Sequence, residues 1–411
     1  MKDERARVFA APLDTLNPAQ PALFQADAMW PHFERLRKEA PVHFTAESQY
    51  GPYWSITKYN DIMAVDTNHQ AFSSEGGITI FQGPGGDKGP LPMFIAMDPP
   101  KHDVQRKTVT PAVSPTNLTV LEPLIRERAI KILDDLPIGE EFDWVDVVSK
   151  ELTAMTLATL FDAPQEDRRK LTYWSDVVTA VPGHGLVNSF EEKMEIFKEY
   201  QAYFIELWNQ RVNAPPAGDL ISMLAHGAET RNMDAREYFG NIVLLTVGGN
   251  DTTRNTISGS VLALNQNPDQ YRLLRERADL IPSMVSETIR WQTPLAHMRR
   301  TANQDIEFRG KQIRKGDKVV MWYVSGNRDE EAIENPDAYV IDRERPRHHI
   351  SFGFGIHRCV GNRLAELQLK VIWEEILARF PMIEVVAAPK RVYSTFVRGY
   401  ESLRVVIPKR T

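Results

Sequence analysis

The one cysteine of this 411-residue chain, Cys359, lies in a glycine-rich segment directly before a predicted helix. The segment reads SFGFGIHRCVGNRLAELQLK over residues 351–370, and its second half has the apolar periodicity of a helix. Unpaired N–H groups and the dipole at a helix start favour negative charge, so we expect them to lower the pKa of the thiol. A thiolate on such a turn can ligate a metal, haem iron in particular. The alternative is a buried, inert thiol, which is the commoner fate of a lone cysteine.

A second candidate site interrupts the longest predicted helix, residues 234–265. Two adjacent glycines, Gly248 and Gly249, are followed by Asp251 and Thr252. Each of these residue types weakens a helix interior by up to about 1 kcal/mol relative to alanine. Such a cost predicts a bend or a cavity at this point. The alternative is a locally imperfect helix whose polar side chains are solvated.

Two further pairs have the spacing of neighbours on one helical face. His102 and Arg106 are four residues apart, and Glu287 and Arg290 are three apart. Taken alone, the first pair is compatible with a solvated basic turn. An exposed pair such as the second contributes only about 0.3–0.5 kcal/mol. Neither pair therefore indicates a site without further context.

The elements that must position these residues are mainly helical. Helical patterns run from residue 101 to about 292 and are broken at prolines, whereas short strand patterns follow after Pro294. A short amphipathic helix is predicted over 32–41, and strands are predicted on both sides of a Gly51-Pro52 turn. We therefore expect a mainly α fold with small β-sheets, of the α+β class, with the 234–265 helix running through its middle.

We expect residues 1–411 to form a single domain, because no linker separates two independent cores. Residues 1–31 are proline-rich and weakly patterned, and are predicted to be an extended N-terminal lead-in. Residues 76–100 are too rich in glycine and proline for regular structure. This long segment is also oily, which predicts a loop that folds over something apolar.

Composition limits the classes of function. A net charge of −6 without a basic stripe argues against nucleic acid as the main partner. The longest apolar run, residues 242–247, is too short to span a bilayer, and no secretory signal is visible. A single cysteine excludes an internal disulfide framework, so we expect a cytoplasmic protein.

The cysteine segment resembles a known signature. FGFGIHRCVG, residues 352–361, matches the pattern Phe-Gly-x-Gly-x-(His or Arg)-x-Cys-x-Gly of the cytochrome P-450 superfamily. The resemblance implies that Cys359 is the axial ligand of the iron of haem b. It implies that Phe352 shields the sulfur and that His357 lies near a haem propionate. Glycines such as Gly361 leave room for the flat porphyrin.

The other candidate residues match further landmarks of the same superfamily, in its order. The resemblance implies that Gly248 and Gly249 open a groove for dioxygen, and that Asp251 and Thr252 form an alcohol-acid pair that relays protons. The basic residues that it assigns to the haem propionates are His102, Arg106 and Arg300, with Arg299 as the nearby competitor.

The Glu287–Arg290 pair also acquires a meaning from the resemblance. In the superfamily this Glu-x-x-Arg pair is buried and is joined by a downstream arginine. Arg343 is the candidate, and Arg345 would serve if the register were shifted. The whole chain then resembles a soluble bacterial cytochrome P-450, whose long central helix crosses over the haem.

The activity implied is that of a haem-thiolate monooxygenase, which inserts one oxygen atom of O2 into a C–H bond. Electrons would come from NADH through a flavin-dependent reductase and a [2Fe–2S] ferredoxin, and the chain is expected to be a monomer. A basic docking surface for an acidic ferredoxin would lie on the thiolate side, formed by Arg106, Lys107, Arg358 and Arg363.

Three longer stretches, GGNDTTRNTISG, SETIRWQTPLAHMRRTA and HHISFGFGIHRCVGNRLAELQLK, are similar to the bacterial family that hydroxylates medium-chain alkanes and fatty acids at the terminal carbon. Terminal hydroxylation attacks the strongest C–H bonds of the chain, so its selectivity has to come from orientation. We therefore expect a narrow channel that admits the chain end-on. His184 and Arg398 are candidates for contacting a head group. The predicted apolar pocket residues are Ile80, Phe81, Leu91, Met93, Phe94, Val178, Val181, Leu244, Leu245, Leu295, Phe396 and Val397.

Four alternatives stay open at this point. The chain would hydroxylate a terpene or steroid if the pocket had a different shape, because the haem motifs do not distinguish substrates. A peroxygenase is disfavoured by the intact Asp251-Thr252 pair. From other classes, Cys359 would be the nucleophile of a hydrolase, or the ligand of a haem sensor without turnover.

Overall fold

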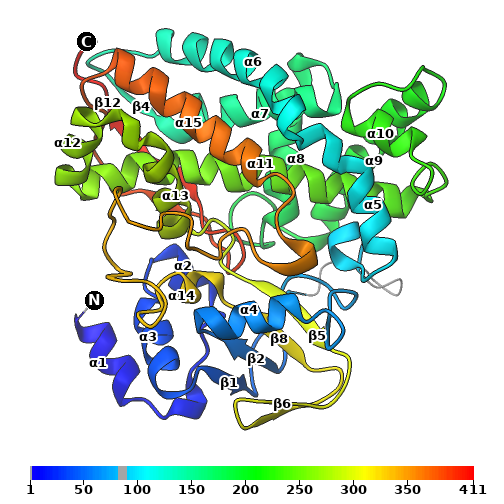
Figure 1. The fold of residues 1–411 in the computed structure, drawn as a ribbon, viewed down its shortest axis with the longest axis vertical. Coiled ribbons are helices and arrows are strands. Elements are labelled where there is room, and N and C mark those ends of the chain that lie inside the picture. Colours follow the sequence, from blue (N-terminus) through cyan, green and yellow to red (C-terminus); the bar gives the residue numbers. More distant parts are fainter. Residues whose placement is uncertain (1, 82–89) are drawn as a thin grey trace.

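The computed structural model describes residues 2–81 and 90–411, so part of the predicted 76–100 loop lies outside the described residues. Most of the chain is helical, and the long helices are gathered in the upper part of Figure 1. The prediction of a mainly α fold with small sheets is confirmed. The helices of this part are α5 (Lys101–Val109), α6 (Pro115–Asp134), α7 (Lys150–Phe161), α8 (Arg168–Thr179), α9 (Phe190–Val212), α10 (Leu220–His226), α11 (Ala235–Gln266), α12 (Pro268–Glu276), α13 (Ile281–Gln292) and α15 (Asn362–Arg379).

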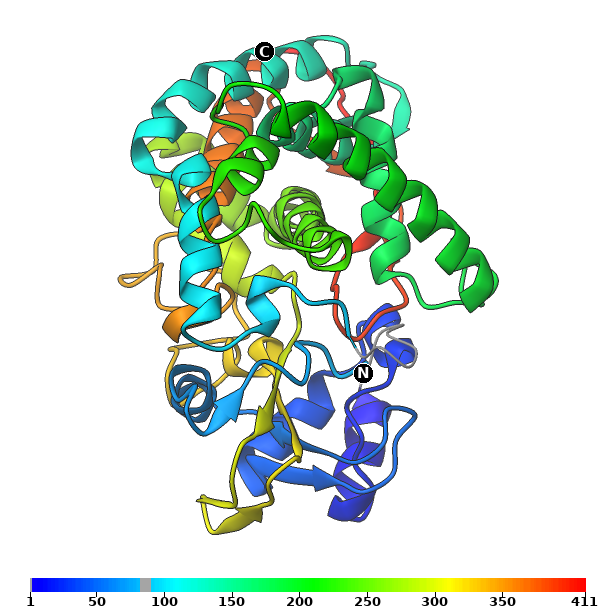
Figure 2. The ribbon, with the colours of Figure 1, turned by 90° about the vertical axis from the view of Figure 1, so that its right-hand side faces the viewer.

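Helix α11 is the axis of this part of the molecule. It crosses the full width of Figure 1, and Figure 2 shows it nearly end-on with the other helices around it. Asp234 caps it, because its carboxylate accepts from the backbone N–H groups of Arg236 (2.9 Å) and Glu237 (2.8 Å). The helix continues without a break through Gly248 and Gly249. The prediction of one long central helix is therefore confirmed, and the glycines lie in its middle.

A five-stranded sheet occupies the lower part of Figure 1. Its strand order is β1-β2-β8-β5-β3, and only β2 and β8 pair in parallel. Helices α3 (Trp30–Glu39), α4 (Tyr59–Thr67) and the short α14 (Tyr323–Gly326) accompany it. The strands are β1 (Val42–Thr45), β2 (Tyr53–Ile56), β3 (Phe72–Ser73), β5 (Met298–Ala302) and β8 (Lys318–Met321).

Three smaller antiparallel sheets complete the fold. They are formed by β4 (Glu141–Asp143), β12 (Arg404–Val406) and β9 (Glu384–Val385), by β6 (Ile306–Phe308) and β7 (Lys311–Ile313), and by β10 (Lys390–Arg391) and β11 (Tyr400–Ser402). Single turns of 3₁₀ or π-helix cover Leu13–Thr15, Phe94–Ala96, Thr110–Val113, Val145–Ser149, Gln165–Asp167, Ala278–Leu280 and Gly355–His357.

The N-terminal segment is not the extended lead-in that the sequence predicted. It forms α1 (Lys2–Ala10) and α2 (Pro21–Gln25), joined by a 3₁₀ turn. The prolines misled the prediction, because Pro21 occupies the start of a helix, where it is tolerated. Helix α1 packs against α3, and Val8, Leu16 and Leu36 form a small buried cluster there. Burial of these apolar side chains fixes the segment against the rest of the chain.

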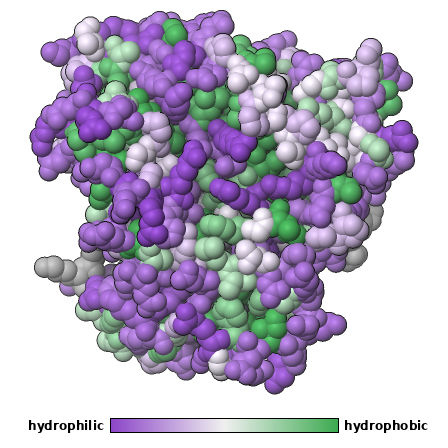
Figure 3. Space-filling view, viewed as in Figure 1, coloured by the Kyte–Doolittle hydropathy of each residue, from purple (hydrophilic) through white to green (hydrophobic). Residues whose placement is uncertain are grey.

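The face shown in Figure 3 is mainly hydrophilic, with hydrophobic residues in scattered small patches. Among residues 2–81 and 90–411, no helix combines the length and the apolar character that crossing a membrane requires.

Candidate functional site

A cavity of about 830 Å³ lies between α11 and the cysteine segment. On one side it is lined by Phe352, Cys359 and Gly361, and on the other by Gly248 and Thr252 of α11. Residues more than one hundred positions apart in the sequence thus meet across one space. The two strongest candidate sites of the sequence are therefore two walls of the same cavity.

The turn that carries the cysteine is held in one conformation. Gly353 and Gly355 have φ angles of 66° and 67°, which side chains other than glycine rarely adopt. A Cβ atom at Gly355 would lie 2.7 Å from the carbonyl oxygen of Asp66, so a side chain does not fit there. The backbone N–H of Cys359 donates to the carbonyl of Phe352 at 2.8 Å and closes the loop. The glycines are thus required by this turn.

Cys359 is exposed and lines the cavity. Burial raises its pKa, although the backbone N–H of Gly361 and the charges of Arg106 and Arg358 act in the opposite direction. The sequence predicted a lowered pKa, and that prediction is wrong for the free thiol, because desolvation outweighs the donors at the start of α15. Coordination to a metal deprotonates a thiol outright, so the raised pKa does not oppose ligation.

Asp66 of α4 organises the other side of this turn, and the sequence analysis missed it. Its carboxylate accepts from the backbone N–H of Phe354 (2.7 Å), from the Tyr323 hydroxyl (2.8 Å) and from the Arg300 guanidinium (2.7 Å). The side chains of Asp66, Tyr323 and Arg300 are buried. The only available signal was an aspartate directly after the buried Val65 on a short helix.

The predicted histidines meet beside the cavity. The rings of His102 and His357 lie 4.3 Å apart, centroid to centroid. His357 Nε2 contacts the Ser74 hydroxyl at 2.9 Å, and His102 Nδ1 contacts Asp103 at 2.7 Å. Burial lowers the pKa of both, to about 2 for His357. The second ring nitrogen of each, His102 Nε2 and His357 Nδ1, is buried and has no hydrogen-bond partner among the described residues.

The predicted arginines differ in how they are compensated. Arg300 pairs with Asp66 and donates to the carbonyl of Arg299 at 2.9 Å. Arg299 is also buried, and burial lowers its pKa, but in the part of the chain that the structure describes its Nε and Nη1 atoms have no hydrogen-bond partner. Arg106 donates to the carbonyl of Arg358. Arg106, Arg299 and Arg300 all line the cavity.

These unpartnered donors test whether the predicted haem fits. Buried polar groups in native proteins normally have partners, so a group of unsatisfied donors beside one cavity points to a missing acceptor. A haem carries two propionate carboxylates in addition to the iron that a thiolate ligates. Imidazole and guanidinium N–H groups are suitable donors to these carboxylates. Cys359 provides the thiol, Arg299 provides free guanidinium donors, and the His357 ring provides an unused nitrogen. The residues present therefore fit a haem.

The α11 wall has an opening at its glycines. A Cβ atom at Gly248 would have no atom within 4 Å, whereas one at Gly249 would lie 3.0 Å from Leu157 of α7. Thr252 lines the cavity, and its hydroxyl donates to the carbonyl of Gly248 at 3.0 Å. Gly248 thus adds open space to the cavity beside the Thr252 hydroxyl, and Gly249 allows α7 to approach α11.

Asp251 faces away from the cavity, toward α8. Its carboxylate accepts from the hydroxyls of Ser175 (2.9 Å) and Thr179 (3.4 Å) and lies 3.2 Å from Arg254. Arg254 also pairs with Asp176. Complete burial raises the pKa of Asp251, Arg254 opposes this, and the negative charge of Asp176 adds to it. Asp251 and Thr252 are thus adjacent in sequence but face different surroundings, and no contact between their side chains occurs among the described residues.

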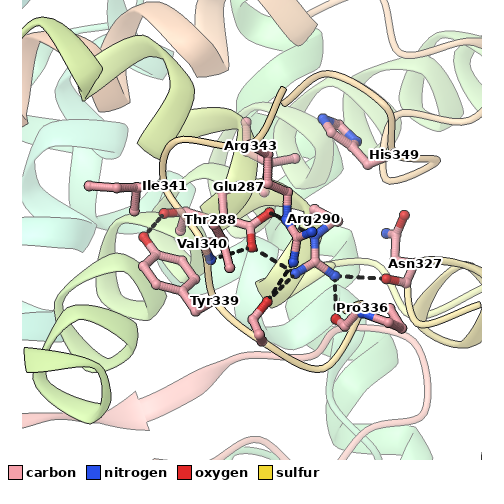
Figure 4. A network of polar contacts seen from close by, with 12 residues as sticks. Glu287, Thr288, Arg290, Asn327, Pro336, Tyr339, Val340, Ile341, Arg343 and His349 are labelled. Atoms are coloured by element: carbon pink, nitrogen blue, oxygen red, sulfur yellow. Dashed lines mark hydrogen bonds and ion pairs between the residues drawn. The ribbon is translucent and has the colours of Figure 1, made fainter. Parts of the chain in front are cut away.

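Glu287 and Arg290 form a buried ion pair of 2.7 Å (Figure 4). Arg343 completes it at 3.0 Å from Glu287, so Arg343 rather than Arg345 is the third member. Arg290 also donates to the carbonyls of Asn327 (2.8 Å), Pro336 (2.7 Å) and Ala338 (2.9 Å).

Asn327 links this cluster to the cysteine segment. Its side chain accepts from the backbone N–H of Ile350 (2.9 Å) and donates to the Ser351 hydroxyl (2.8 Å). The cluster therefore supports the segment that leads to Cys359, and it does not line the cavity.

Most of the predicted pocket residues line the cavity, but Ile80 and Val397 do not. Ile80 belongs to a buried cluster with Trp322, and Val397 pairs with Leu295 in an isolated bridge. Their neighbours Phe81 and Phe396 do line the cavity. The residues that line it as predicted are Phe81, Leu91, Met93, Phe94, Val178, Val181, Leu244, Leu245, Leu295 and Phe396.

Of the two candidate head-group contacts, one lines the cavity and the other does not. His184 lines the cavity and stacks on Tyr393, with ring centroids 3.9 Å apart. Arg398 does not line it, because its guanidinium packs against Trp30 and pairs with Asp27 at 3.3 Å. Arg398 therefore has a structural position.

Lys193 of α9 is a cavity residue that the sequence analysis missed. It is 3% exposed and lies on the buried face of its helix with Phe197, Tyr200, Phe204 and Leu207. The signal was present, because positions 193, 197, 200, 204 and 207 have the spacing of one helical stripe and only the first is charged.

The residues proposed for docking are accessible. Lys107, Arg358 and Arg363 are exposed and Arg106 is half-buried. Arg106 and Arg358 are close enough to Cys359 to act on the pKa of its thiol, so they lie on the thiolate side. Their role in binding a partner remains a prediction.

Comparisons with known proteins agree on one family. The family model described as Cytochrome P450 matches residues 19–398. Linalool 8-monooxygenase from Pseudomonas putida is 37% identical over 393 residues, 92% of this chain and 96% of that protein. A methyl-branched lipid omega-hydroxylase from Mycobacterium tuberculosis is 32% identical over 391 residues, 91% of this chain and 90% of that protein.

Solved structures show the same similarity. Cytochrome P450-153 from Novosphingobium aromaticivorans has 45% identity and a TM-score of 0.88, covering 95% of this chain and 99% of that one. CYP153D17 from Sphingomonas has 46% identity and a TM-score of 0.89, covering 96% and 100%.

Proposed function

This chain belongs to the cytochrome P450 family, the haem-thiolate monooxygenases, and from that premise we propose that it hydroxylates medium-chain n-alkanes or fatty acids at the terminal carbon. The observation that carries the proposal is the cavity, whose oily wall lies opposite Cys359. Away from the haem residues, the charged or titratable side chains that line the cavity are Lys193, His184, Tyr50 and Tyr393.

The family and fold bind haem b, and the residues of this chain are suited to hold it. Cys359 would ligate the iron, and Arg299, Arg300, Arg106, His102 and His357 would surround the propionates. When bound, the haem supplies the activation of O2 with two electrons and two protons, so that one oxygen atom enters a C–H bond and the other leaves as water.

The apolar wall binds and orients the substrate. Burying each methylene contributes about 0.8 kcal/mol, so a chain gains affinity as it lengthens until the cavity is filled. Leu244 and Leu245 of α11 stand next to the Gly248 opening in sequence, and a chain lying along them would present its end there. The primary C–H bonds at that end are the strongest in the chain, so regioselectivity has to come from this orientation.

Protons reach the cavity through Thr252 in this proposal. Its hydroxyl holds a proton on the Gly248 carbonyl and can rotate toward the cavity. Asp251, the preceding residue of α11, is the proton source in this proposal, because burial raises its pKa. Arg254 and Asp176 connect Asp251 to the partly exposed Lys150, which pairs with Asp176 at 3.2 Å.

Electrons would come from NADH through a flavin-dependent reductase and a [2Fe–2S] ferredoxin. The exposed Arg358 and Arg363 and Lys107 offer positive charge to an acidic partner on the thiolate side. Reversing one charge, in Arg363→Glu, should weaken ferredoxin binding and reduce the salt dependence of the affinity. An unchanged affinity and salt dependence would show that the docking surface lies elsewhere.

The proposal is tested with octane, dodecane and dodecanoic acid. We expect each to displace water from the haem, seen as a shift of its absorption spectrum, and to yield product hydroxylated at the terminal carbon. The proposal is wrong if none of the three shifts the spectrum or yields that product.

A second candidate is hydroxylation of a terpene, favoured by the 37% identity to linalool 8-monooxygenase. A steroid is the related alternative, since a steroid C26-monooxygenase from Mycolicibacterium smegmatis is 32% identical over 385 residues. Linalool and a steroid belong in the same ligand panel, and tighter binding of either one would favour it over the linear chains.

A further inference from the structure

Lys193 is a buried cation without an acidic partner. Its side chain is 3% exposed, and no carboxylate of the described residues forms an ion pair with it. Burial alone lowers its pKa, to about 8, with no opposing effect from any charged neighbour. Buried charges in proteins are normally paired, so an unpaired ammonium that lines a ligand cavity needs an explanation.

The protein groups around the Lys193 ammonium do not use all of its N–H donors. Nζ donates to the carbonyls of Val178 and Ala180, both at 2.9 Å. An ammonium has three N–H donors, so one remains after these two bonds. The Phe197 ring lies 5.8 Å from Nζ and contributes no lone pair. The side chain therefore retains one donor and one uncompensated charge.

Helix positions explain why the charge stays inside. Helices α8 and α9 pack against each other and against the same helix, α11 (Figure 1). Lys193 lies in the first turn of α9 on its buried face, and Val178 and Ala180 lie at the C-terminal end of α8. The α8 carbonyls hold the ammonium inside, where Lys193 is 3% exposed.

A purely structural explanation accounts for part of this. A cation at a helix C-terminus hydrogen-bonds the last carbonyls and interacts favourably with the dipole. That role uses two of the donors but does not require the side chain to line the cavity, and it leaves a full charge opposite the oily wall. The remaining donor and charge match an anionic group at the end of an otherwise apolar ligand.

We propose that Lys193 binds the carboxylate of a chain-shaped substrate whose other end reaches the haem side of the cavity. This inference rests on the proposed function and narrows it: among the linear substrates, fatty acids rather than alkanes are those that the cavity is built to hold. The carboxylate would occupy the third donor of the ammonium, and the chain would lie along the apolar wall, with its methyl end near Thr252.

The test compares three ligands that share one chain: dodecanoate, methyl dodecanoate and dodecane. Their affinities for the holoenzyme are measured from the shift of the haem absorption spectrum. In Lys193→Met, a side chain of similar length without charge, we expect the preference for dodecanoate over dodecane to fall by about tenfold or more, because a hydrogen bond to a charged group is lost. Lys193→Arg should retain most of the preference.

Lys198 provides the matched control on the same helix. Its side chain is 69% exposed and pairs with Glu195 at the surface, so Lys198→Met should leave the preference unchanged. Equal weakening of all three ligands by Lys193→Met would show that the lysine only caps α8, and unchanged affinities for all three would show that the carboxylate binds elsewhere. Either result overturns the inference while terminal hydroxylation of dodecane still stands. Failure of the unmodified protein to bind any of the three ligands would instead overturn the proposed function.

Discussion

The two walls of the cavity are built on different principles. On the cysteine side, buried ion pairs and backbone hydrogen bonds fix the chain: Asp66 holds Phe354 and Arg300, and Glu287 holds Arg290 and Arg343. On the opposite side, apolar side chains from α8, α9, α11 and two loops meet, and Lys193 is the buried cation among them. The cysteine side therefore fixes the position of the atom that ligates the iron. The apolar side fixes only the shape of the space for the substrate, so small changes there should alter which substrate fits without altering the chemistry.

Two ion pairs with the same spacing in the sequence differ in their burial. Glu287–Arg290 and Asp269–Arg272 are both three residues apart on a helix, at 2.7 Å and 2.5 Å. The first pair is buried, whereas the side chains of the second are 82% and 66% exposed. Local sequence does not distinguish them. Their energetic difference comes from what the rest of the chain places around them.

The largest predicted effect is on the buried pair. Glu287→Ala would leave Arg290 and Arg343 as uncompensated charges, and we expect a loss of about 3–5 kcal/mol in the free energy of unfolding. Denaturant unfolding of the holoenzyme measures this. Asp269→Ala is the matched control and should change the stability very little. Similar losses in the two variants would refute the distinction between them.

A smaller effect is expected at Asp66. Asp66→Asn keeps the size of the side chain but removes the charge opposite Arg300, which should cost about 2 kcal/mol of unfolding free energy. The control is Asp61→Asn on the same helix, whose partner Arg309 is 46% exposed. Asp66→Asn should lose more unfolding free energy than Asp61→Asn. The thiolate signature of the haem spectrum should change in Asp66→Asn and stay the same in Asp61→Asn.

On the apolar wall, the effect should appear in ligand length. Val178→Phe would fill part of the cavity, and each methylene that no longer fits loses about 0.8 kcal/mol, roughly fourfold in affinity. Dissociation constants for n-alkanes of increasing length would show the longest tightly bound chain becoming shorter. Val212→Phe, at an exposed position on α9, should leave the series unchanged. An unaltered series in Val178→Phe would mean that chains do not lie along this wall.

The last predicted effect is a pH dependence of carboxylate binding. Burial lowers the pKa of Lys193 to about 8, so its ammonium is charged below that pH and neutral above it. Dodecanoate stays ionised throughout this range, so its affinity should fall by about tenfold between pH 7 and pH 9. His184, the titratable side chain of the adjacent segment, stacks on Tyr393. Lys193→Met should abolish the pH dependence, and a dependence that survives in this variant would have to come from another group.

The cysteine side could be predicted from sequence because its information is local. The turn needs glycine at Gly353 and Gly355, and these positions stand within a few residues of Cys359. The long helix was equally accessible, since its periodicity extends over more than thirty residues. The sequence could not show whether Arg343 or Arg345 joins the Glu287–Arg290 pair, because a shift of two residues within a loop cannot be recognised without the fold.

The opposite wall could be predicted only in part, because it depends on tertiary packing. Phe81 and Phe396 line the cavity while their neighbours Ile80 and Val397 do not, and hydrophobicity alone does not give that alternation. The raised pKa of Cys359 was missed because desolvation depends on distant segments. Lys193 was overlooked although it interrupts an apolar stripe, because a charged residue is ordinarily assigned to the surface.

The most direct test of the central assignment is the absorption spectrum of the reduced protein with carbon monoxide. If Cys359 ligates the haem iron as a thiolate, the Soret band of this complex is strongly red-shifted, and Cys359→Ser abolishes the shift. A colourless purified protein, or a carbon-monoxide complex whose Soret band lacks the shift, would contradict the assignment of Cys359.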